Sequence, residues 1–132
     1  MRTRAGQSLL ELAICLPIVL SLGLGGAAVV QVAEASTGLH AATEAAASAA
    51  ARAPDVVTAA EYAQARFASV IRDYPVRSAG LAFPATDVGR GSIVTLVGTG
   101  FVDVGWSSLA APGRIQLRAQ ATFRVEPWRT RR

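Results

Sequence analysis

The side chains that can do chemistry are few and far apart in this sequence. Cys15 is the sole cysteine, and His40 has no Cys, Asp or second His at metal-ligand spacing. Asp73, Asp87 and Asp103 stand singly among apolar or loop residues. Neither a phosphate-binding G-x-x-x-x-G-K-[ST] loop nor a G-x-S-x-G nucleophile turn occurs. We therefore expect no catalytic residue, no metal, no cofactor and no enzymatic activity.

Glu11 is the one ionisable side chain whose position demands an explanation. It lies in a segment, Leu9 to Val30, in which the only other strongly polar residue is Ser21. A carboxylate at the centre of a bilayer costs about 2.5–3.5 kcal/mol, and less near the interface. Glu11 either meets a cationic partner or reaches the headgroups near the positive end of its own helix, which contributes about 0.3–1 kcal/mol.

The apolar segment itself is long enough to cross a membrane. Leu9 to Val30 is 22 residues, against the roughly 20 that a helix needs to span the hydrocarbon layer. Arg2 and Arg4 precede it, whereas the following stretch carries two glutamates and no cation before Arg52. This asymmetry predicts a cytoplasmic N-terminus and an extracytoplasmic C-terminal part.

Two other interpretations of the segment remain open. A secretory signal peptide has an apolar core of about 7–15 residues and a small-residue cleavage site, and Ala33-Glu34-Ala35 fits such a site. Cleavage after Ala35 would release a secreted binding domain. Alternatively, an uncleaved segment would make the chain a single-pass accessory subunit of another membrane complex.

The order of residues in "RAGQSLLELAICLPIVL" resembles the class III leader of type IV pilins and pseudopilins, most closely the start of TadE-like proteins of tight-adherence pilus systems. The similarity covers roughly residues 4 to 30. It implies that a prepilin peptidase cuts after Gly6 and that the mature chain begins at Gln7. Glu11 then matches the family's glutamate at the fifth mature position, and Pro17 matches a proline common in its membrane helix.

The resemblance also implies partners and a location. The partners are the prepilin peptidase, a major pilin, other pseudopilins and the pilus assembly platform. The location is the bacterial inner membrane, with the protein either entering the filament or priming its assembly. Nucleic acid is not an expected partner, because the net charge of +4 is spread along the chain without a basic patch.

Cleavage after Gly6 would have a direct electrostatic consequence. It removes both leader arginines and leaves an amine on Gln7, with a reference pKa near 7.7–8.0. Glu11 lies one helical turn further on and can face this amine on its own chain or on a neighbouring one.

The remaining sequence predicts an α+β fold: a long N-terminal helix extending outward, a second amphipathic helix and a small antiparallel sheet. One helix is expected from about residue 8 to 52, with Gly38 a possible break and Pro54 a strong one. We divide the chain into a leader (1–6), the membrane and extended helix (7–52) and a small extracytoplasmic domain (53–132).

The second helix is predicted in the stretch from Ala53 to Pro75, with Asp55 or Thr58 as its cap and Glu61 at capping-box spacing from Thr58. Its expected buried stripe is Ala63, Phe67, Val70, Ile71 and Tyr74.

Residues 75 to 91 are expected to form a loop because they hold two prolines and three glycines. Strands are predicted at "SIVTLV", "FVDV" and "RIQLRAQATFRVEP", with "GTG" as a hairpin turn between the first two. The last strand alternates cleanly and is expected to bury one face. Its apolar positions are Ile115, Leu117, Ala119, Ala121, Phe123 and Val125.

Overall fold

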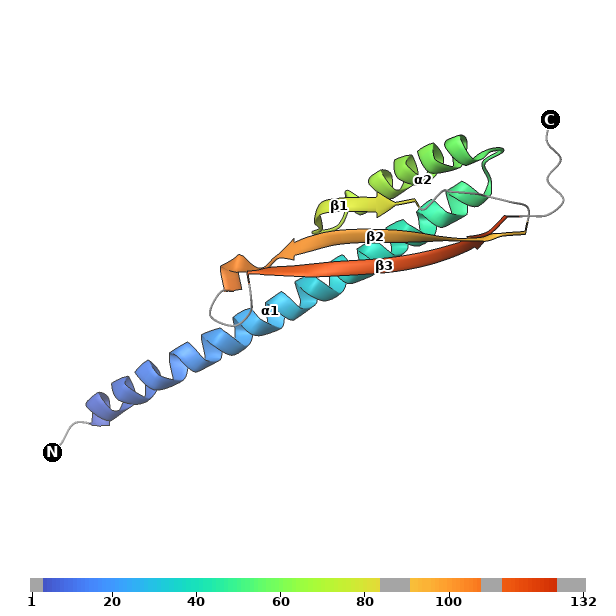
Figure 1. The fold of residues 1–132 in the computed structure, drawn as a ribbon. Coiled ribbons are helices and arrows are strands. Elements are labelled where there is room, and N and C mark those ends of the chain that lie inside the picture. The colour runs from blue at the N-terminus through green and yellow to red at the C-terminus, as the bar shows by residue number, and fades with distance from the viewer. Residues whose placement is uncertain (1–3, 84–90, 108–112, 126–132) are drawn as a thin grey trace.

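The computed structural model describes residues 4–83, 91–107 and 113–125. Its elements in these ranges are α1 (Arg4–Ala51), α2 (Val56–Ile71), β1 (Arg77–Ala82), β2 (Ile93–Asp103), the short 3-10 turn η1 (Gly105–Ser107) and β3 (Arg114–Arg124). The strands form one antiparallel sheet in the order β1-β2-β3. The α+β fold class and the order of its elements are therefore confirmed (Figure 1).

Helix α1 runs without interruption for 48 residues. Alanine, the best helix former, dominates its second half, and neither Pro17 nor Gly38 breaks it. Near its end the amides of Arg52 and Ala53 bond to carbonyls three residues back, at 3.2 and 3.1 Å, which tightens the last turn before Pro54.

Helix α2 begins where the sequence predicts a cap. Asp55 has an extended backbone, and its carboxylate accepts hydrogen bonds from the Thr58 backbone N–H and hydroxyl, both at 2.8 Å. Thr58 thus supports the Asp55 cap and is not the cap itself. Of the predicted stripe, Ala63 and Phe67 are buried, whereas Tyr74 lies beyond the end of the helix.

The prediction of a hairpin turn at "GTG" is wrong. β2 continues through Gly98, Thr99 and Gly100, and pairs with β3 in unbroken register from Ile93↔Arg124 to Asp103↔Arg114. Both glycines face α1 or the segment before β1. A Cβ on Gly98 would meet the Thr43 hydroxyl, and a Cβ on Gly100 would meet the Val76 side chain. Glycine permits close approach here and does not reverse the chain.

The prediction of a loop over residues 75 to 91 is also wrong in part, because β1 lies inside it. β1 pairs with β2 from Arg77↔Phe101 to Ala82↔Val97, with a register shift between Arg77 and Gly80. Ser78 has a positive φ of 50° at this irregularity, as in a β-bulge. Pro84 and Asp87, which the predicted loop included, lie outside the described residues.

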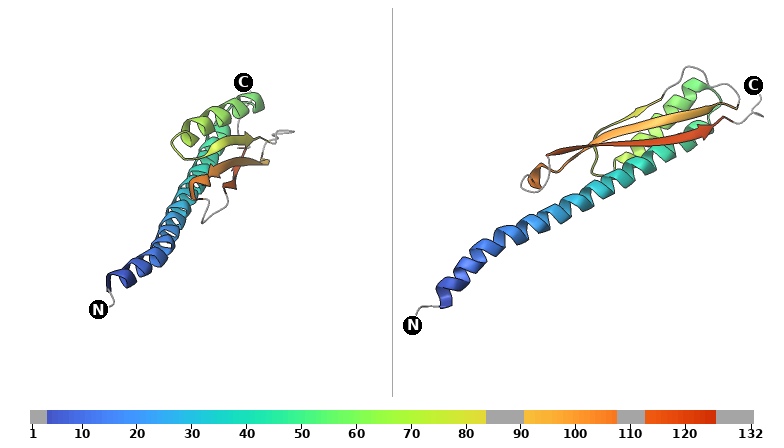
Figure 2. Two further views of the ribbon diagram at one scale, coloured as in Figure 1. Left: turned by 90° about the vertical axis from the view of Figure 1, so that its left-hand side faces the viewer. Right: turned by 60° about the horizontal axis from the view of Figure 1, so that its bottom comes forward.

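The helices cover one face of the sheet. α1 packs against β2 and β3, and α2 turns back along α1 (Figures 1 and 2). The larger apolar cluster joins Leu39 and the buried alanines of α1 to Phe67, Leu96 and Phe123. In β3 the predicted apolar positions are buried or half-buried, and the alternating polar positions are exposed, as expected.

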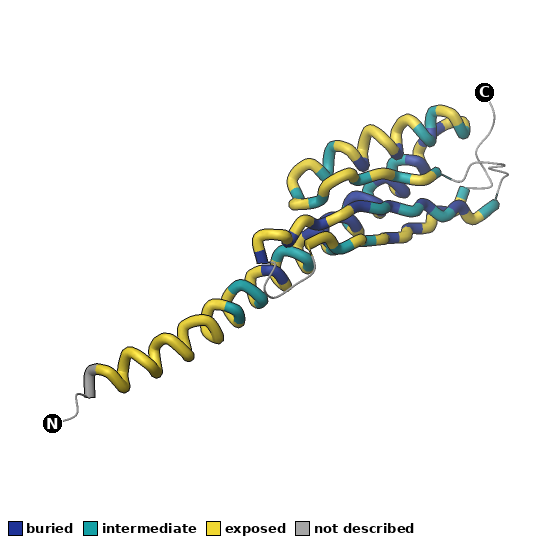
Figure 3. Tube along the Cα trace, turned by 60° about the vertical axis from the view of Figure 1, so that its left-hand side comes forward, coloured by how far each residue is buried: buried dark blue, intermediate teal, exposed yellow. Residues whose placement is uncertain are grey.

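A second, smaller cluster lies nearer the start of α1. Ala28 and Ala35 pack there against Val102 and Val104, with Val32 partly buried beside them. The sheet therefore remains in contact with α1 down to residue 28. Before this point, α1 leaves the rest of the molecule and stands alone (Figure 3).

Candidate functional site

The residues predicted for processing and assembly all lie on the free part of α1. Gly6, Gln7 and Glu11 are exposed, and Gln7 and Glu11 are one turn apart on the same helix. Ala28 is the first buried side chain in the described part of α1, about 25 Å along the axis beyond Glu11. The fold therefore leaves these three residues open to other molecules.

The helix that carries them is apolar on all sides. Leu24 is half-buried, and eleven of its large apolar side chains are each between 50% and 72% exposed: Leu9, Leu10, Leu12, Ile14, Leu16, Ile18, Val19, Leu20, Leu22, Val29 and Val30. A helix that is hydrophobic all round belongs in a protein core or a membrane. The most apolar part of α1 is only 6% buried, so this part of the helix does not belong to the core of the fold.

Among the described residues, α1 is the one helix long and apolar enough to cross a membrane. The criterion is length and composition, with a mean hydropathy of 2.3, and a signal sequence near an N-terminus meets it equally well.

The middle of the free segment has features that suit packing against other helices. Ser21 donates a hydrogen bond of 2.7 Å to the carbonyl oxygen of Pro17 one turn earlier, so its hydroxyl is satisfied within the helix. Gly23 and Ala27 are exposed one turn apart, and nothing lies within 4 Å of a Cβ placed on Gly23. Such small-residue faces allow helices to approach closely in lipid.

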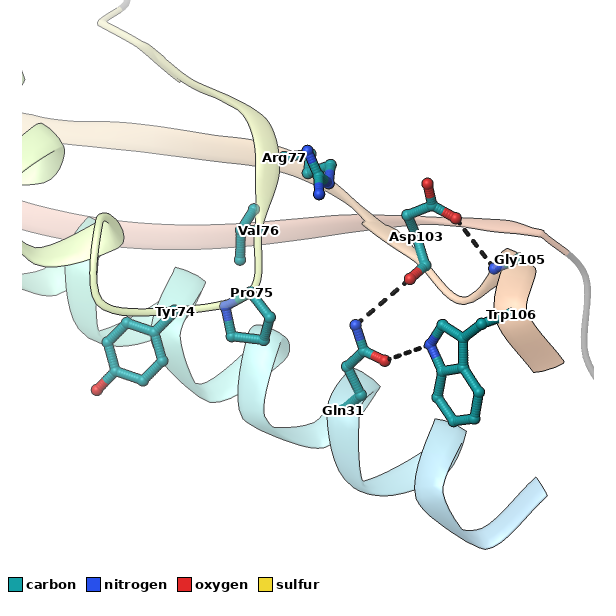
Figure 4. A pocket seen from close by; sticks show the side chains of 8 residues that line it. All are labelled: Gln31, Tyr74, Pro75, Val76, Arg77, Asp103, Gly105 and Trp106. Atoms are coloured by element: carbon teal, nitrogen blue, oxygen red, sulfur yellow. Dashed lines mark hydrogen bonds between the residues drawn. The ribbon is translucent and has the colours of Figure 1, made fainter. Parts of the chain in front are cut away.

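A hollow of about 700 Å³ opens at the base of the domain, where α1 meets η1 just beyond its free part (Figure 4). Gln31 links α1 to the end of β2 and to η1. The Gln31 side-chain amide donates to the backbone oxygen of Asp103 at 3.3 Å, and the Trp106 indole N–H donates to the Gln31 oxygen at 2.9 Å. One Asp103 carboxylate oxygen accepts from the Gly105 amide at 3.0 Å.

The outer sheet face carries a row of cations on β3. Arg114, Arg118 and Arg124 are exposed there, and the cross-strand neighbours of the last two are Thr99 and Ile93. Arg114 alone has an acidic residue opposite, Asp103. The β3 side of this face is polar and solvated, in agreement with the alternation predicted for the strand, whereas β2 adds the exposed Ile93 and Phe101.

A further hollow, of about 560 Å³, lies between the helices over small side chains, with Arg52, Tyr62 and Arg66 on its rim.

In the part of the chain that the structure describes, no three His, Cys, Asp or Glu side chains gather as metal ligands would. His40 and Asp73 are exposed, and Cys15 is exposed on the free helix.

The cap of α2 carries the clearest electrostatic effect among the described groups. The hydrogen bonds from the Thr58 backbone N–H and hydroxyl hold the pKa of the Asp55 carboxyl below its ordinary value of 3.8. Donors that bond the ionised form favour it, so Asp55 stays charged in mildly acidic solution.

The sequence predicts the long apolar helix but not the hollow at its base. Gln31 and Trp106 are 75 positions apart, and their contact depends on β2 running its full length back to the helix. A hairpin turn at "GTG" would have put Trp106 elsewhere. The one local signal was a tryptophan in a Gly-Ser segment directly after a strand.

Comparisons of the chain with models of known protein families, with curated proteins and with solved structures found no match.

Proposed function

We propose that this chain is a minor pseudopilin or pilus-assembly protein of the TadE-like kind in a tight-adherence system. It is inserted in the bacterial inner membrane with its N-terminus in the cytoplasm, is cut by a prepilin peptidase after Gly6, and acts by helix packing and protein contacts. Its partners are the major pilin, other pseudopilins and the assembly platform.

The main support for the proposal is the spacing of three residues on the part of α1 that the rest of the fold does not cover. Gly6, Gln7 and Glu11 stand at the head of an exposed apolar segment, which continues unbroken into the small α+β domain. A helix that only anchored the domain would not need a carboxylate one turn after a glycine cleavage site. The pairing of a new amine on Gln7 with Glu11 of a neighbouring chain accounts for it.

The alternative of a secreted domain released after Ala35 fits the fold less well. Ala35 is fully buried, and together with Ala28 it covers Val102 and Val104. Loss of residues 1–35 would strip Ala28, Val32 and Ala35 from both valines, which are now 0% exposed. A single-pass accessory subunit of another complex is compatible with the fold but leaves the position of Glu11 without a reason.

The mass of the mature chain, measured in cells that contain a prepilin peptidase, separates the three functions. The proposal expects a chain beginning at Gln7. A chain beginning at Ser36 would identify the secreted domain, and one beginning at Met1 or Arg2 the uncleaved anchor. Either of these two results contradicts processing after Gly6.

A further inference from the structure

The base of the domain lies level with the end of the apolar run of α1. At about 1.5 Å per residue, Leu9–Val30 rises about 33 Å, which is close to the roughly 30 Å of the hydrocarbon layer. The domain already covers the last turn of the run, because Ala28 is buried in one cluster with Val102 and Val104. With the run in the hydrocarbon, the domain therefore begins at the membrane surface and not at a distance from it.

The short turn η1 is the part of the domain that lies at this level. It follows β2, at the end of the sheet nearest the free part of α1 (Figure 1). The Trp106 indole N–H donates to the Gln31 oxygen at 2.9 Å, and Gln31 directly follows Val30, the last residue of the run. The headgroup layer extends roughly 5–7 Å beyond the hydrocarbon, whereas one residue adds about 1.5 Å along a helix. Trp106 is therefore placed at the boundary between hydrocarbon and headgroups.

The contacts of Trp106 suit such a boundary. The ring is 50% exposed, and its one polar group is satisfied by Gln31, which in turn donates to the Asp103 backbone oxygen (Figure 4). The turn itself, Gly105–Ser107, has no charged side chain. Tryptophan is enriched at membrane interfaces because its ring has an apolar body and one polar group. Here the polar group is bonded within the protein, and the apolar body remains free for lipid.

We propose that Trp106 rests in the lipid interface beside α1 and gives the domain its own contact with the outer surface of the membrane. The inference rests on the proposed membrane span of α1. The partner is the boundary of the lipid layer, and the contact requires no particular headgroup. Because Trp106 lies on one side of α1, the contact also selects the side toward which the helix leans.

The test uses the full chain in phosphatidylcholine vesicles, with Trp106 as the fluorescent probe after Trp128→Phe removes the other tryptophan. The lipid is brominated either high in the acyl chain or near its end. We expect the high bromine to quench Trp106 about twofold more strongly than the deep one, because the ring lies at the edge of the hydrocarbon.

Tyr62→Trp, in a chain with both natural tryptophans replaced by phenylalanine, is the matched control. Tyr62 is 51% exposed, almost the same as Trp106, but it lies in the hollow beside Ala45 and Arg52 of α1, about 20 Å further along the helix axis than Gln31. Neither lipid should quench this probe. Quenching of Trp106 no stronger than that of the Tyr62→Trp probe would overturn the contact.

A third probe separates this inference from the proposed span. Leu20→Trp, in the same phenylalanine background, lies near the middle of the run and reports whether α1 enters the bilayer. If deeply brominated lipid quenches this probe while Trp106 is quenched no more than the Tyr62→Trp probe, the contact is wrong and the span stands. If the Leu20→Trp probe is not quenched, the span is wrong, and the contact that rests on it is wrong as well.

Discussion

Glu11 carries the one formal charge between Gly6 and Val30, and it is exposed on the part of α1 that the domain does not touch. Glu11→Gln keeps the size of the side chain, removes the charge and makes membrane insertion easier. If the carboxylate meets the Gln7 amine of a neighbouring chain, co-purification of the major pilin from detergent should fall at least several-fold. Cleavage and membrane insertion should be retained.

Glu34→Gln is the matched control, because Glu34 is exposed on the same helix beyond the apolar run. It should leave the recovery of pilin unchanged. A carboxylate that merely reached the headgroups would change helix stability by about 1 kcal/mol or less, with no selective loss of partners. Equal recovery of pilin with wild type and Glu11→Gln would therefore refute the assembly role.

Gly6 lies in open space, with nothing within 4 Å of an added Cβ. Gly6→Val should therefore leave the fold and insertion intact while blocking a peptidase that needs close access to the backbone. We expect the uncleaved mass to accumulate in cells that process wild type. Gly23→Val, also in open space, should be cleaved normally, and normal cleavage of Gly6→Val would count against the class III leader.

The lowered pKa of Asp55 predicts that the stability of the fold falls as the pH is lowered. Its pKa is lowered in the folded state, so its contribution to stability is present above the ordinary value of 3.8 and is lost as pH falls through the lowered value. Asp55→Ala should lower the melting temperature at pH 7, and the difference from wild type should shrink toward pH 2. Thermal unfolding followed by circular dichroism measures both, and a difference independent of pH would contradict the capping role.

At the scale of the elements, β3 offers a comparison of its two faces. Phe123 is 8% exposed and contacts the Phe83 ring, with 6.4 Å between ring centroids, whereas Arg118 is exposed. Phe123→Asp removes a buried aromatic ring and introduces an unpaired charge, so it should cost at least about 3 kcal/mol. Arg118→Ala should change stability by less than about 0.5 kcal/mol. Equal protease sensitivity of the two variants would contradict these face assignments.

The elements that could be predicted are those whose pattern is local. β3 alternates over its whole length, and the breaker Pro54 and the cap Asp55 mark the boundary between the helices. β1 gives no such signal, because "RSAGLA" has mostly small residues, and pairing with β2 rather than strand propensity makes it extended.

The other wrong predictions involve glycine. Glycine can either reverse or break the chain or allow a neighbouring side chain to come close, and the sequence alone does not distinguish these two roles. "GTG" suggested a turn and Gly38 a helix break, yet Gly98 and Gly38 serve to admit neighbours. A Cβ on Gly38 would collide with the Tyr74 ring. Such neighbours come from distant positions, so single-sequence reasoning identifies the glycine but not what approaches it. The contact between Gln31 and Trp106 could not be predicted for the same reason, because the two residues are distant in the sequence. Gly6, Gln7 and Glu11 could be proposed because their spacing along the chain was enough.

For the whole molecule, the overlap of the domain with the end of the apolar run predicts where α1 can be shortened. A fragment of residues 27–132 keeps Ala28 and Ala35 over Val102 and Val104, whereas a fragment of residues 36–132 does not. Complete exposure of a valine costs about 1.5–3 kcal/mol, and Val76, Ile115 and Leu117 still cover part of both, so the shorter fragment should lose up to roughly 3–6 kcal/mol. Urea unfolding of the two fragments measures the difference, and equal midpoints would show that the smaller cluster is dispensable.

The uninterrupted course of α1 has a geometric consequence for the outer domain. No loop separates the apolar run from the part of α1 that packs against α2 and the sheet. A tilt of the run therefore tilts the domain by the same angle. Membrane helices lean by about 20° on average, and more in thin bilayers than in thick ones. From Val30 to Ala51 the helix rises about 30 Å, so a lean of this size carries the far end of the domain sideways by about 10 Å. If the apolar run spans a membrane as proposed, the thickness of the bilayer would thereby set the direction in which Arg114, Arg118 and Arg124 face.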